Sequence, residues 1–344
     1  MSFGATPADE GFFLPPDWGP HERSWLCWPH RRDLWGEELM AAKVAFAELA
    51  RTIRRFEPVG VLARPVEATE ARLACGPGIA IQQMDYEDAW LRDNGPAFLV
   101  DMQGHVAGVH WHLAGTPGRH ARERGRDEQV GPRLLDSLGL HRFPAPLELA
   151  GGTFHADGLG TLLASEEGLF GGGRNPELTR QEVEALLATY LGVRRIVWLG
   201  AGFIGPGSSG QIDRLCRFAG AGRVLLQGSQ GENDPNRDVM ADALARLQAA
   251  RDARGRDLEV MVLPAPRRLP GGLSYTALCL ANGAVLVPAF DDPADETAQA
   301  MIARAFPGRE IVPVAAAMLS AAGGSLRRIT LEQPKPIGQH APMA

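Results

Sequence analysis

Cysteine, histidine and aspartate are residue types in this chain whose spacing could support nucleophilic or metal-dependent chemistry. The cysteines are Cys27, Cys75, Cys216 and Cys279. They are scattered and form no CxxC pair, so the spacing predicts neither a disulfide framework nor a zinc site. We expect each of them to be a small buried apolar residue. His155 and Asp157 could begin a metal site, but two ligands without a third are better explained by a turn.

Composition limits the classes of function that need to be considered. The chain has 344 residues, a formal net charge of -6 and 45% hydrophobic residues, which is typical of a globular protein. The mild acidity gives no electrostatic reason to expect nucleic acid as a partner. No apolar run approaches the ~18 residues of a membrane span, and the first residues do not resemble a signal peptide. The expected location is the cytoplasm.

Helix-like and strand-like segments alternate along the chain. The predicted helices are Glu37–Phe56, a segment from Thr179 to Gly192, Arg237–Ala250 and Ala294–Phe306. The predicted strands are Arg195–Leu199, Arg223–Leu226, Leu258–Leu263 and Ile311–Val314. Thr179 and Glu182 form a capping-box pattern, and Tyr275–Pro288 reads as a hairpin around Asn282-Gly283, a dipeptide that favours a type I′ turn.

This alternation predicts an α/β protein. Periodicity alone suggests a parallel doubly wound sheet, but it cannot separate that sheet from a ring of short βα modules. The length first suggests two domains, although one large closed architecture is also compatible with it.

Several motifs together resemble the agmatine deiminases and bacterial-type peptidylarginine deiminases. The first is PPDWGPHERSWLCWP at Pro15–Pro29. The others follow in the family's order: WLRDNGP at Trp90–Pro96, GGTFHADGLGTLL at Gly151–Leu163, RNP at Arg174–Pro176, ANGAVLVP at Ala281–Pro288, FPGR at Phe306–Arg309 and ITLEQP at Ile329–Pro334. Nearly the whole chain is covered, and seven motifs in the correct order are far more specific than one.

The resemblance implies the pentein fold, a five-bladed β/α propeller with pseudo-fivefold symmetry and an active site at its central channel. We therefore expect residues 1–344 to form a single pentein domain, in place of a doubly wound sheet. The resemblance implies no cofactor and is compatible with a homodimer.

Guanidine hydrolysis in this family is understood to need carboxylates that hold the guanidinium, a cysteine thiolate that attacks its carbon and a histidine that transfers protons. Asp93 keeps the aspartate of the family's Trp-x-Arg-Asp motif. Ala150 stands where the family has a glutamate. The Asp-Gly-His-x-Asp motif aligns with SGQID, so Ser209 and Gln211 replace its first aspartate and its histidine, and Asp213 is retained.

The cysteine motif near the C-terminus aligns with GGSLRRIT at Gly323–Thr330. Arg327 stands at its histidine and Arg328 at its nucleophilic cysteine. Arginine stays protonated in proteins and cannot be this nucleophile, and glutamine cannot accept a proton as imidazole does. With the two lost acids, the site is more positive than its relatives by about four charges if the replaced acids were ionised.

Four hypotheses fit these substitutions. The central pocket could bind a small carboxylate- or phosphate-bearing ligand through Arg327 or Arg328. The guanidinium of Arg328 could instead lie between Asp93 and Asp213 and imitate substrate. The protein could also be an enzyme of altered chemistry that uses Asp93, Asp213 and His155, or it could keep residual deiminase activity through another cysteine.

The resulting prediction is an agmatine deiminase-like protein that is inactive as a thiol-dependent guanidine hydrolase and binds a small anionic ligand. The alternative is a hydrolase of guanidine or amidine C–N bonds by altered chemistry. The expected ligand-binding residues are Trp90, Arg92, Asp93, Gln211, Asp213, Arg327 and Arg328, with no metal. Simpler explanations exist for two of them: Asp93 suits a turn before Asn94-Gly95, and Arg92 could pair with a neighbouring acid.

Overall fold

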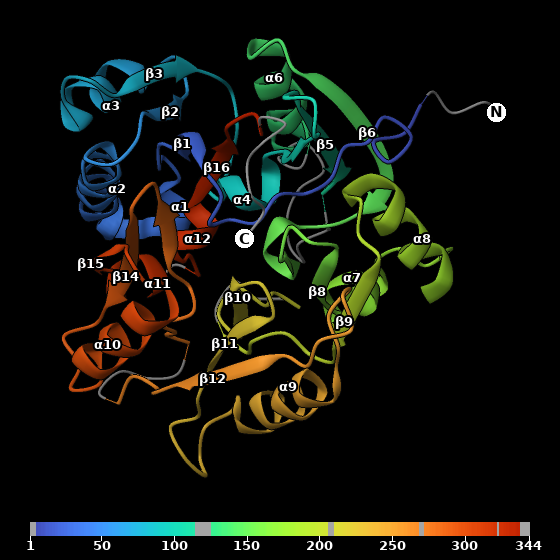
Figure 1. Ribbon diagram of the computed structural model, residues 1–344. Helices are drawn as coiled ribbons and strands as arrows, with labels where there is room; N and C mark the ends of the chain where they lie inside the picture. The colour runs from blue at the N-terminus through green and yellow to red at the C-terminus, as the bar shows by residue number, and fades with distance from the viewer. Residues whose placement is uncertain (1–4, 114–124, 206–209, 268–271, 322, 338–344) are drawn as a thin grey trace.

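The computed structural model describes residues 5–113, 125–205, 210–267, 272–321 and 323–337. The described strands form five small sheets, none with more than four strands. The sheets are arranged in a ring around the centre of the molecule, and the long helices lie on its outer side (Figure 1). The doubly wound sheet suggested by periodicity alone is therefore wrong, because neighbouring strand–helix units start new sheets instead of extending one.

Each three-stranded sheet has the same construction. Its first two strands are antiparallel neighbours, and the third pairs in parallel with the second. These strands are β4 (Ala97–Val100), β5 (Val106–His112) and β6 (His141–Glu148); β7 (Phe154–Ala156), β8 (Thr161–Ser165) and β9 (Arg195–Leu199); β10 (Cys216–Gly220), β11 (Arg223–Gln227) and β12 (Glu259–Leu263); and β13 (Cys279–Ala281), β14 (Ala284–Ala289) and β15 (Glu310–Ala315).

The fifth sheet is built from both ends of the chain and closes the ring. Its strands are β1 (His21–Cys27), β2 (Val59–Ala63), β3 (Ala80–Gln83) and β16 (Thr330–Pro334). β16 is antiparallel to β1, with Ser24 opposite Glu332, and β2 is parallel to β1. The pairing of β1 with β16 brings the first and last motifs of the sequence into contact.

The predicted helices are confirmed with small changes at their ends. The described α-helices are α1 (Arg32–Trp35), α2 (Leu39–Arg54), α3 (Ala68–Cys75), α4 (Leu91–Asn94), α6 (Val130–Ser137), α7 (Glu166–Phe170), α8 (Arg180–Leu191), α9 (Arg237–Ala249), α10 (Asp295–Ala305), α11 (Ala317–Ala321) and α12 (Leu326–Ile329). α8 has the expected capping box between Thr179 and Glu182 and ends at Gly192 in the left-handed conformation.

The predicted hairpin of β13 and β14 is confirmed, but the prediction of a type I′ turn in it is wrong. A type I′ turn needs positive φ at both central residues, and of the two only Gly283 has it, at +76°. The Asn282 side chain exchanges two hydrogen bonds with the backbone of His21, both 2.9 Å, and the backbone N–H of Asn282 donates to Glu57 Oε2 at 2.7 Å. These tertiary contacts fix Asn282 and override the local preference of the dipeptide.

The cores lie between the sheets and the outer helices. A cluster of buried apolar side chains joins the fifth sheet to α2 and to the β13–β15 sheet. Gly60 in β2 lets the strand approach Trp25, since a Cβ there would lie 2.3 Å from the indole ring. No helix in the described ranges is long and apolar enough to cross a membrane. The ring surrounds the two short helices α4 and α12 (Figure 1).

Candidate functional site

The residues predicted to bind ligand are presented mainly by α4, α12 and the segment before β10. α12 packs against α4. Ser325 caps α12, and its Oγ accepts a hydrogen bond from the Arg328 N–H at 3.0 Å. Gly324 permits close approach to α4, because a Cβ at that residue would lie 2.6 Å from the Trp90 ring. This packing brings Arg328 next to Asp93 and Trp90.

Trp90, Asp93, Gln211 and Arg328 form one group, here called the Asp93 centre. Arg328 Nε donates to Asp93 Oδ2 at 2.6 Å, and its Cζ lies 5.2 Å from the centroid of the Trp90 ring. Gln211 Nε2 donates to the same carboxylate oxygen at 3.1 Å, and Gly152 N donates to Oδ1 at 3.2 Å. The carboxylate of Asp93 thus holds residues from three distant segments, which the explanation of Asp93 as a turn residue does not account for.

Asp213 lies beside this group and is linked to it through Ser325. Ser325 Oγ donates to Asp213 Oδ2 at 2.6 Å and accepts from the backbone N–H of Arg328. The ion pair of Arg328 is with Asp93, and the part of the chain that the structure describes contains none between Arg328 and Asp213. The expectation that the Arg328 guanidinium lies between two acids is therefore confirmed for Asp93. It is wrong for Asp213, because the carboxylate of Asp213 accepts a hydrogen bond from Ser325 instead.

Two substituted positions remain, Ala150 and Ser209. Ala150 is half-buried, and its carbonyl accepts hydrogen bonds from Thr153 N at 3.0 Å and Thr153 Oγ1 at 2.6 Å. Its methyl side chain gives the site neither charge nor a hydrogen-bonding group. Ser209 lies outside the described residues.

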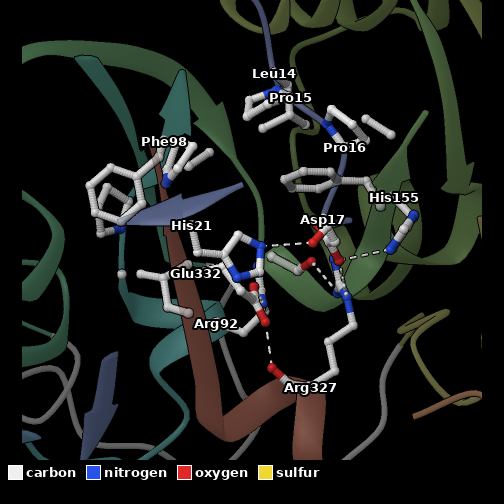
Figure 2. Close-up of a pocket in the computed structure, with 18 of the residues that line it drawn as sticks. Leu14, Pro15, Pro16, Asp17, His21, Arg92, Phe98, His155, Arg327 and Glu332 are labelled. Carbon is white, nitrogen blue, oxygen red and sulfur yellow. Dashed lines mark hydrogen bonds and ion pairs between the residues drawn. The ribbon is translucent and has the colours of Figure 1, made fainter. Parts of the chain in front are cut away.

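Arg327 points into a second group, here called the Asp17 cluster: Asp17, His155, Arg217 and Arg327. Figure 2 shows Asp17, His155 and Arg327 of this cluster. Asp17 Oδ2 lies 2.8 Å from His155 Nε2, 3.2 Å from Arg327 Nε and 3.4 Å from Arg217 Nη2. All three partners are buried. One carboxylate therefore compensates two buried guanidinium groups and also binds an imidazole.

Arg92 lies next to the Asp17 cluster and pairs with Glu332, as the simpler explanation of Arg92 expects. Its Nε also donates to the carbonyl of Arg327 at 3.4 Å. Asp17, Arg92, Arg327 and Glu332 line one cavity of about 50 Å³ (Figure 2). Asp93 and Gln211 do not line it. The expected binding residues are thus divided between two places.

The electrostatics of the Asp17 cluster follow from burial and charge pairing. Burial alone would raise the pKa of Asp17, but the neighbouring His155 and Arg327 outweigh it and hold that pKa well below its usual range. Burial lowers the pKa of His155 to about 3. The N–H of Phe218 donates to His155 Nδ1 at 3.3 Å, so neutral His155 carries its proton on Nε2 and donates it to Asp17.

The metal interpretation of His155 and Asp157 gains nothing from the structure. Asp157 Oδ1 accepts from the N–H groups of Leu159 at 2.7 Å and Thr161 at 2.8 Å, which confirms the turn. Within the described ranges, no three His, Cys, Asp or Glu side chains are grouped to hold a metal ion.

The four cysteines are all buried, as expected. Burial raises the pKa of the thiols of Cys27, Cys216 and Cys279, and it raises that of Cys75 to about 11. A buried neutral thiol lacks the exposure and positive surroundings that activate a nucleophile.

Four contributors to these groups were missed from the sequence: Asp17, Arg217, Ser325 and Glu332. Asp17 and Glu332 lie inside the first and last matching segments, Pro15–Pro29 and Ile329–Pro334. Their place as acidic residues inside two matching segments is the signal that could have found them. Ser325 had the available signal of a helix cap three residues before Arg328.

Comparison with known proteins shows which family this chain is similar to. The sequence model of the Porphyromonas-type peptidyl-arginine deiminases matches residues 13–334. An agmatine deiminase from Stutzerimonas stutzeri is 36% identical over 362 aligned positions, which cover 96% of this chain and 98% of the relative. The solved agmatine deiminase of Enterococcus faecalis superimposes with a TM-score of 0.91 at 29% identity, covering 97% of this chain and 99% of that one.

A more distant solved structure bears on the fold alone. A dimethylarginine dimethylaminohydrolase matches with a TM-score of 0.53 at 14% identity, over 91% of this chain and 99% of that one. Together with the ring of five small sheets, these likenesses confirm the pentein fold that the motifs imply.

Proposed function

The chain belongs to the Porphyromonas-type peptidyl-arginine deiminase family, a family of guanidine-modifying hydrolases, and we propose that its own Arg328 has replaced both the nucleophile and the substrate guanidinium. The observation that carries this proposal is the 2.6 Å contact of Arg328 Nε with Asp93 beside the Trp90 ring. A carboxylate and an aromatic face are what a bound agmatine head group would need. The protein is then a pseudoenzyme for thiol-dependent hydrolysis.

The absence of a nucleophile supports the same conclusion. The family resemblance places the reactive cysteine at Arg328, whose guanidinium stays protonated at any physiological pH. The four cysteines of the chain are buried and their thiol pKa values are raised by burial. None of them has the setting of a replacement thiolate.

Proton transfer is also unsupported at this centre. Gln211 stands at the family's histidine and uses its amide N–H to bind Asp93. Its Oε1 is buried and has no partner among the described residues. An amide oxygen can accept a hydrogen bond but cannot take and return a proton near neutral pH.

The alternative of altered chemistry needs Asp93, Asp213 and His155 to act together. His155 belongs to the Asp17 cluster, where both ring nitrogens already have partners. Asp93 is engaged by Arg328, and Asp213 by Ser325. This division of the three residues favours a pseudoenzyme over a new hydrolase.

Ammonia release from agmatine by the purified natural protein is the first test. We expect no release above a protein-free control. A triple variant, Ala150→Glu with Gln211→His and Arg328→Cys, asks whether the family residues restore turnover. Turnover by the natural protein would contradict the proposal: turnover lost on replacement of one of the four cysteines would reveal a replacement nucleophile, and turnover that survives all four replacements would reveal altered chemistry.

Agmatine binding tests the position of Arg328 directly. Removing its side chain with Arg328→Ala opens the space beside Asp93 and Trp90, so the variant should gain saturable agmatine binding that the natural protein lacks. The gain would appear in calorimetry and as a rise in Tm with agmatine concentration. Arg246→Ala is the matched control, since Arg246 pairs with Asp242 on the exposed face of α9. Equal agmatine affinity in the natural protein and the Arg328 variant would exclude an occupied guanidinium position.

A further inference from the structure

We propose that the cavity beside Asp17 is a binding site for a small monocarboxylate, separate from the Asp93 centre. The cavity has a volume of about 50 Å³, and the guanidinium groups of Arg92 and Arg327 lie in its wall (Figure 2). This site goes beyond the proposed function, because none of the residues that hold Arg328 contributes to it.

The first argument is the charge around the cavity. Three guanidinium groups, those of Arg92, Arg217 and Arg327, share two carboxylates, those of Asp17 and Glu332. Burial lowers the pKa of Arg217 to about 10, so its side chain is still protonated at neutral pH. A surplus positive charge in a buried group is costly, and a bound monoanion compensates it.

The neighbouring histidines do not change this balance. Burial lowers the pKa of His155 to about 3, so His155 is neutral. His21 faces the cavity, and both of its ring nitrogens face acceptors: Nδ1 lies 3.1 Å from Glu57 Oε2 and Nε2 lies 2.8 Å from the carbonyl of Asp17. Both nitrogens therefore donate, and the positive charge of His21 offsets the negative charge of Glu57. Among the described groups that face one another here, the surplus therefore remains one positive charge.

The second argument is hydrogen-bonding capacity. Arg92 uses Nε for the Arg327 carbonyl and Nη2 for Glu332. Arg327 uses Nε for Asp17 and Nη1 for the carbonyl of Gly151 at 3.3 Å. Within the described part of the chain, Arg92 Nη1 and Arg327 Nη2 have no partner, and neither is among the fully buried orphan atoms. Two guanidinium groups thus keep donors available at the cavity they line.

Size and repulsion select the class of anion. One water needs about 10–15 Å³ of such space, so the cavity suits a group of a few heavy atoms, such as formate or acetate. The carboxylates of Asp17 and Glu332 would repel a dianion more strongly than a monoanion. Phe98, Phe154 and Leu331 provide apolar wall for the carbon end. A planar carboxylate also matches the geometry of guanidinium donors.

Arg327 is the residue through which this chain departs from its relatives at the cavity. The family motif that resembles Gly323–Thr330 has histidine at this position. Arginine brings both the surplus charge and the Nη2 donor. Arg327→His therefore restores a residue compatible with the fold while removing the proposed recognition.

The test is isothermal titration calorimetry of the full-length protein with sodium formate and sodium acetate, against chloride and sulfate at matched ionic strength. We expect saturable carboxylate binding that is at least about tenfold weaker in Arg327→His. Arg92→Lys, which keeps the charge but loses the planar donors, should weaken binding by a similar factor. Arg246→His, on the exposed face of α9, should leave the affinity unchanged.

The proposal is overturned if the natural protein shows no saturable binding of either carboxylate, or if Arg327→His binds acetate as tightly as the natural protein. Tighter binding of sulfate than of acetate would contradict the assignment to a monocarboxylate. Because agmatine is absent from these titrations, failure here is distinct from failure of the proposed function.

Discussion

Arg327 and Arg328 are consecutive residues, yet their guanidinium groups enter two different environments. Successive residues of a helix point about 100° apart, so the single turn of α12 sends one to Asp17 and the other to Asp93. At the Asp93 centre, one guanidinium meets one carboxylate, and the remaining donors are the neutral Gln211 and Gly152. At the Asp17 cluster, one carboxylate faces two guanidinium groups and an imidazole.

This difference shows that two substitutions of the same kind need not have the same consequence. Arg328 finds a carboxylate that it can neutralise, so the Asp93 centre is self-contained. Arg327 joins a place where cations already exceed anions, so the Asp17 cluster keeps a surplus charge. Counting charges along the sequence predicts a generally positive pocket, whereas the structure separates a compensated site from an uncompensated one.

The largest effect should come from removing the shared carboxylate. Asp17→Asn leaves buried Arg217 and Arg327 without a counter-charge, and we expect the free energy of unfolding to fall by about 3–5 kcal/mol. Urea unfolding of the natural protein and the variant measures it. Asp33→Asn is the control, because Asp33 pairs with Arg31 at the surface. This substitution should lower the free energy of unfolding by less than about 1 kcal/mol. Equal losses in the two variants would show that Asp17 holds no buried charge.

The Asp93 centre should show a smaller but specific coupling. In a double-mutant cycle of Asp93→Asn and Arg328→Met, we expect a coupling free energy of about 1–3 kcal/mol, because the pair is partly buried. Asp93 retains hydrogen bonds from Gln211 and Gly152 in the single Arg328 variant, which limits the loss. Asp213→Asn with Arg328→Met is the comparison cycle, and its coupling should be smaller, since Ser325 lies between the two residues. Additive effects at Asp93 and Arg328 would mean that the pair is not coupled and that Asp93 acts through its other contacts.

Much of the fold could be predicted, but from different kinds of signal. The helix that follows Thr179 and the strand Arg195–Leu199 could be located because their boundaries depend on local caps and apolar runs. The choice between one doubly wound sheet and five small ones could not be made locally, because it depends on which strands pair. The resemblance to a known family supplied that choice.

The Asp93 centre could be anticipated because its members occupy motif positions. The Asp17 cluster could not, since it depends on ring closure: Asp17 precedes β1, Arg327 lies in α12 directly before β16, and the pairing of β1 with β16 brings the two residues together. The turn at Asn282 was mispredicted for a related reason. Its conformation is set by His21 and Glu57, which are remote in sequence.

The smallest expected effect concerns pH and the two buried histidines. Burial lowers the pKa of His155 to about 3, so between pH 6.5 and 3 the unfolded chain binds a proton that the folded protein does not. Stability from His155 is therefore fully present above pH 6.5 and falls by up to about 1.4 kcal/mol per pH unit below it. Asp17, Arg217 and Arg327 are the charged groups that face this imidazole.

His21 shifts in the opposite sense. Burial opposes its charge, but the hydrogen bond and charge of Glu57 raise its pKa, so its contribution is present below pH 6.5 and is lost only as pH rises through the raised pKa. Burial also lowers the pKa values of His30 and His110, so His155 is isolated by comparing urea unfolding of the natural protein and a His155 variant at pH 6 and pH 5. His155→Gln, which can still donate to Asp17, should lose about 1 kcal/mol less than the natural protein between these pH values. His105→Gln, at an exposed imidazole, is the control, and an unchanged pH slope in His155→Gln would mean that His155 is protonated in the folded protein and that the surplus charge beside Asp17 is larger than one.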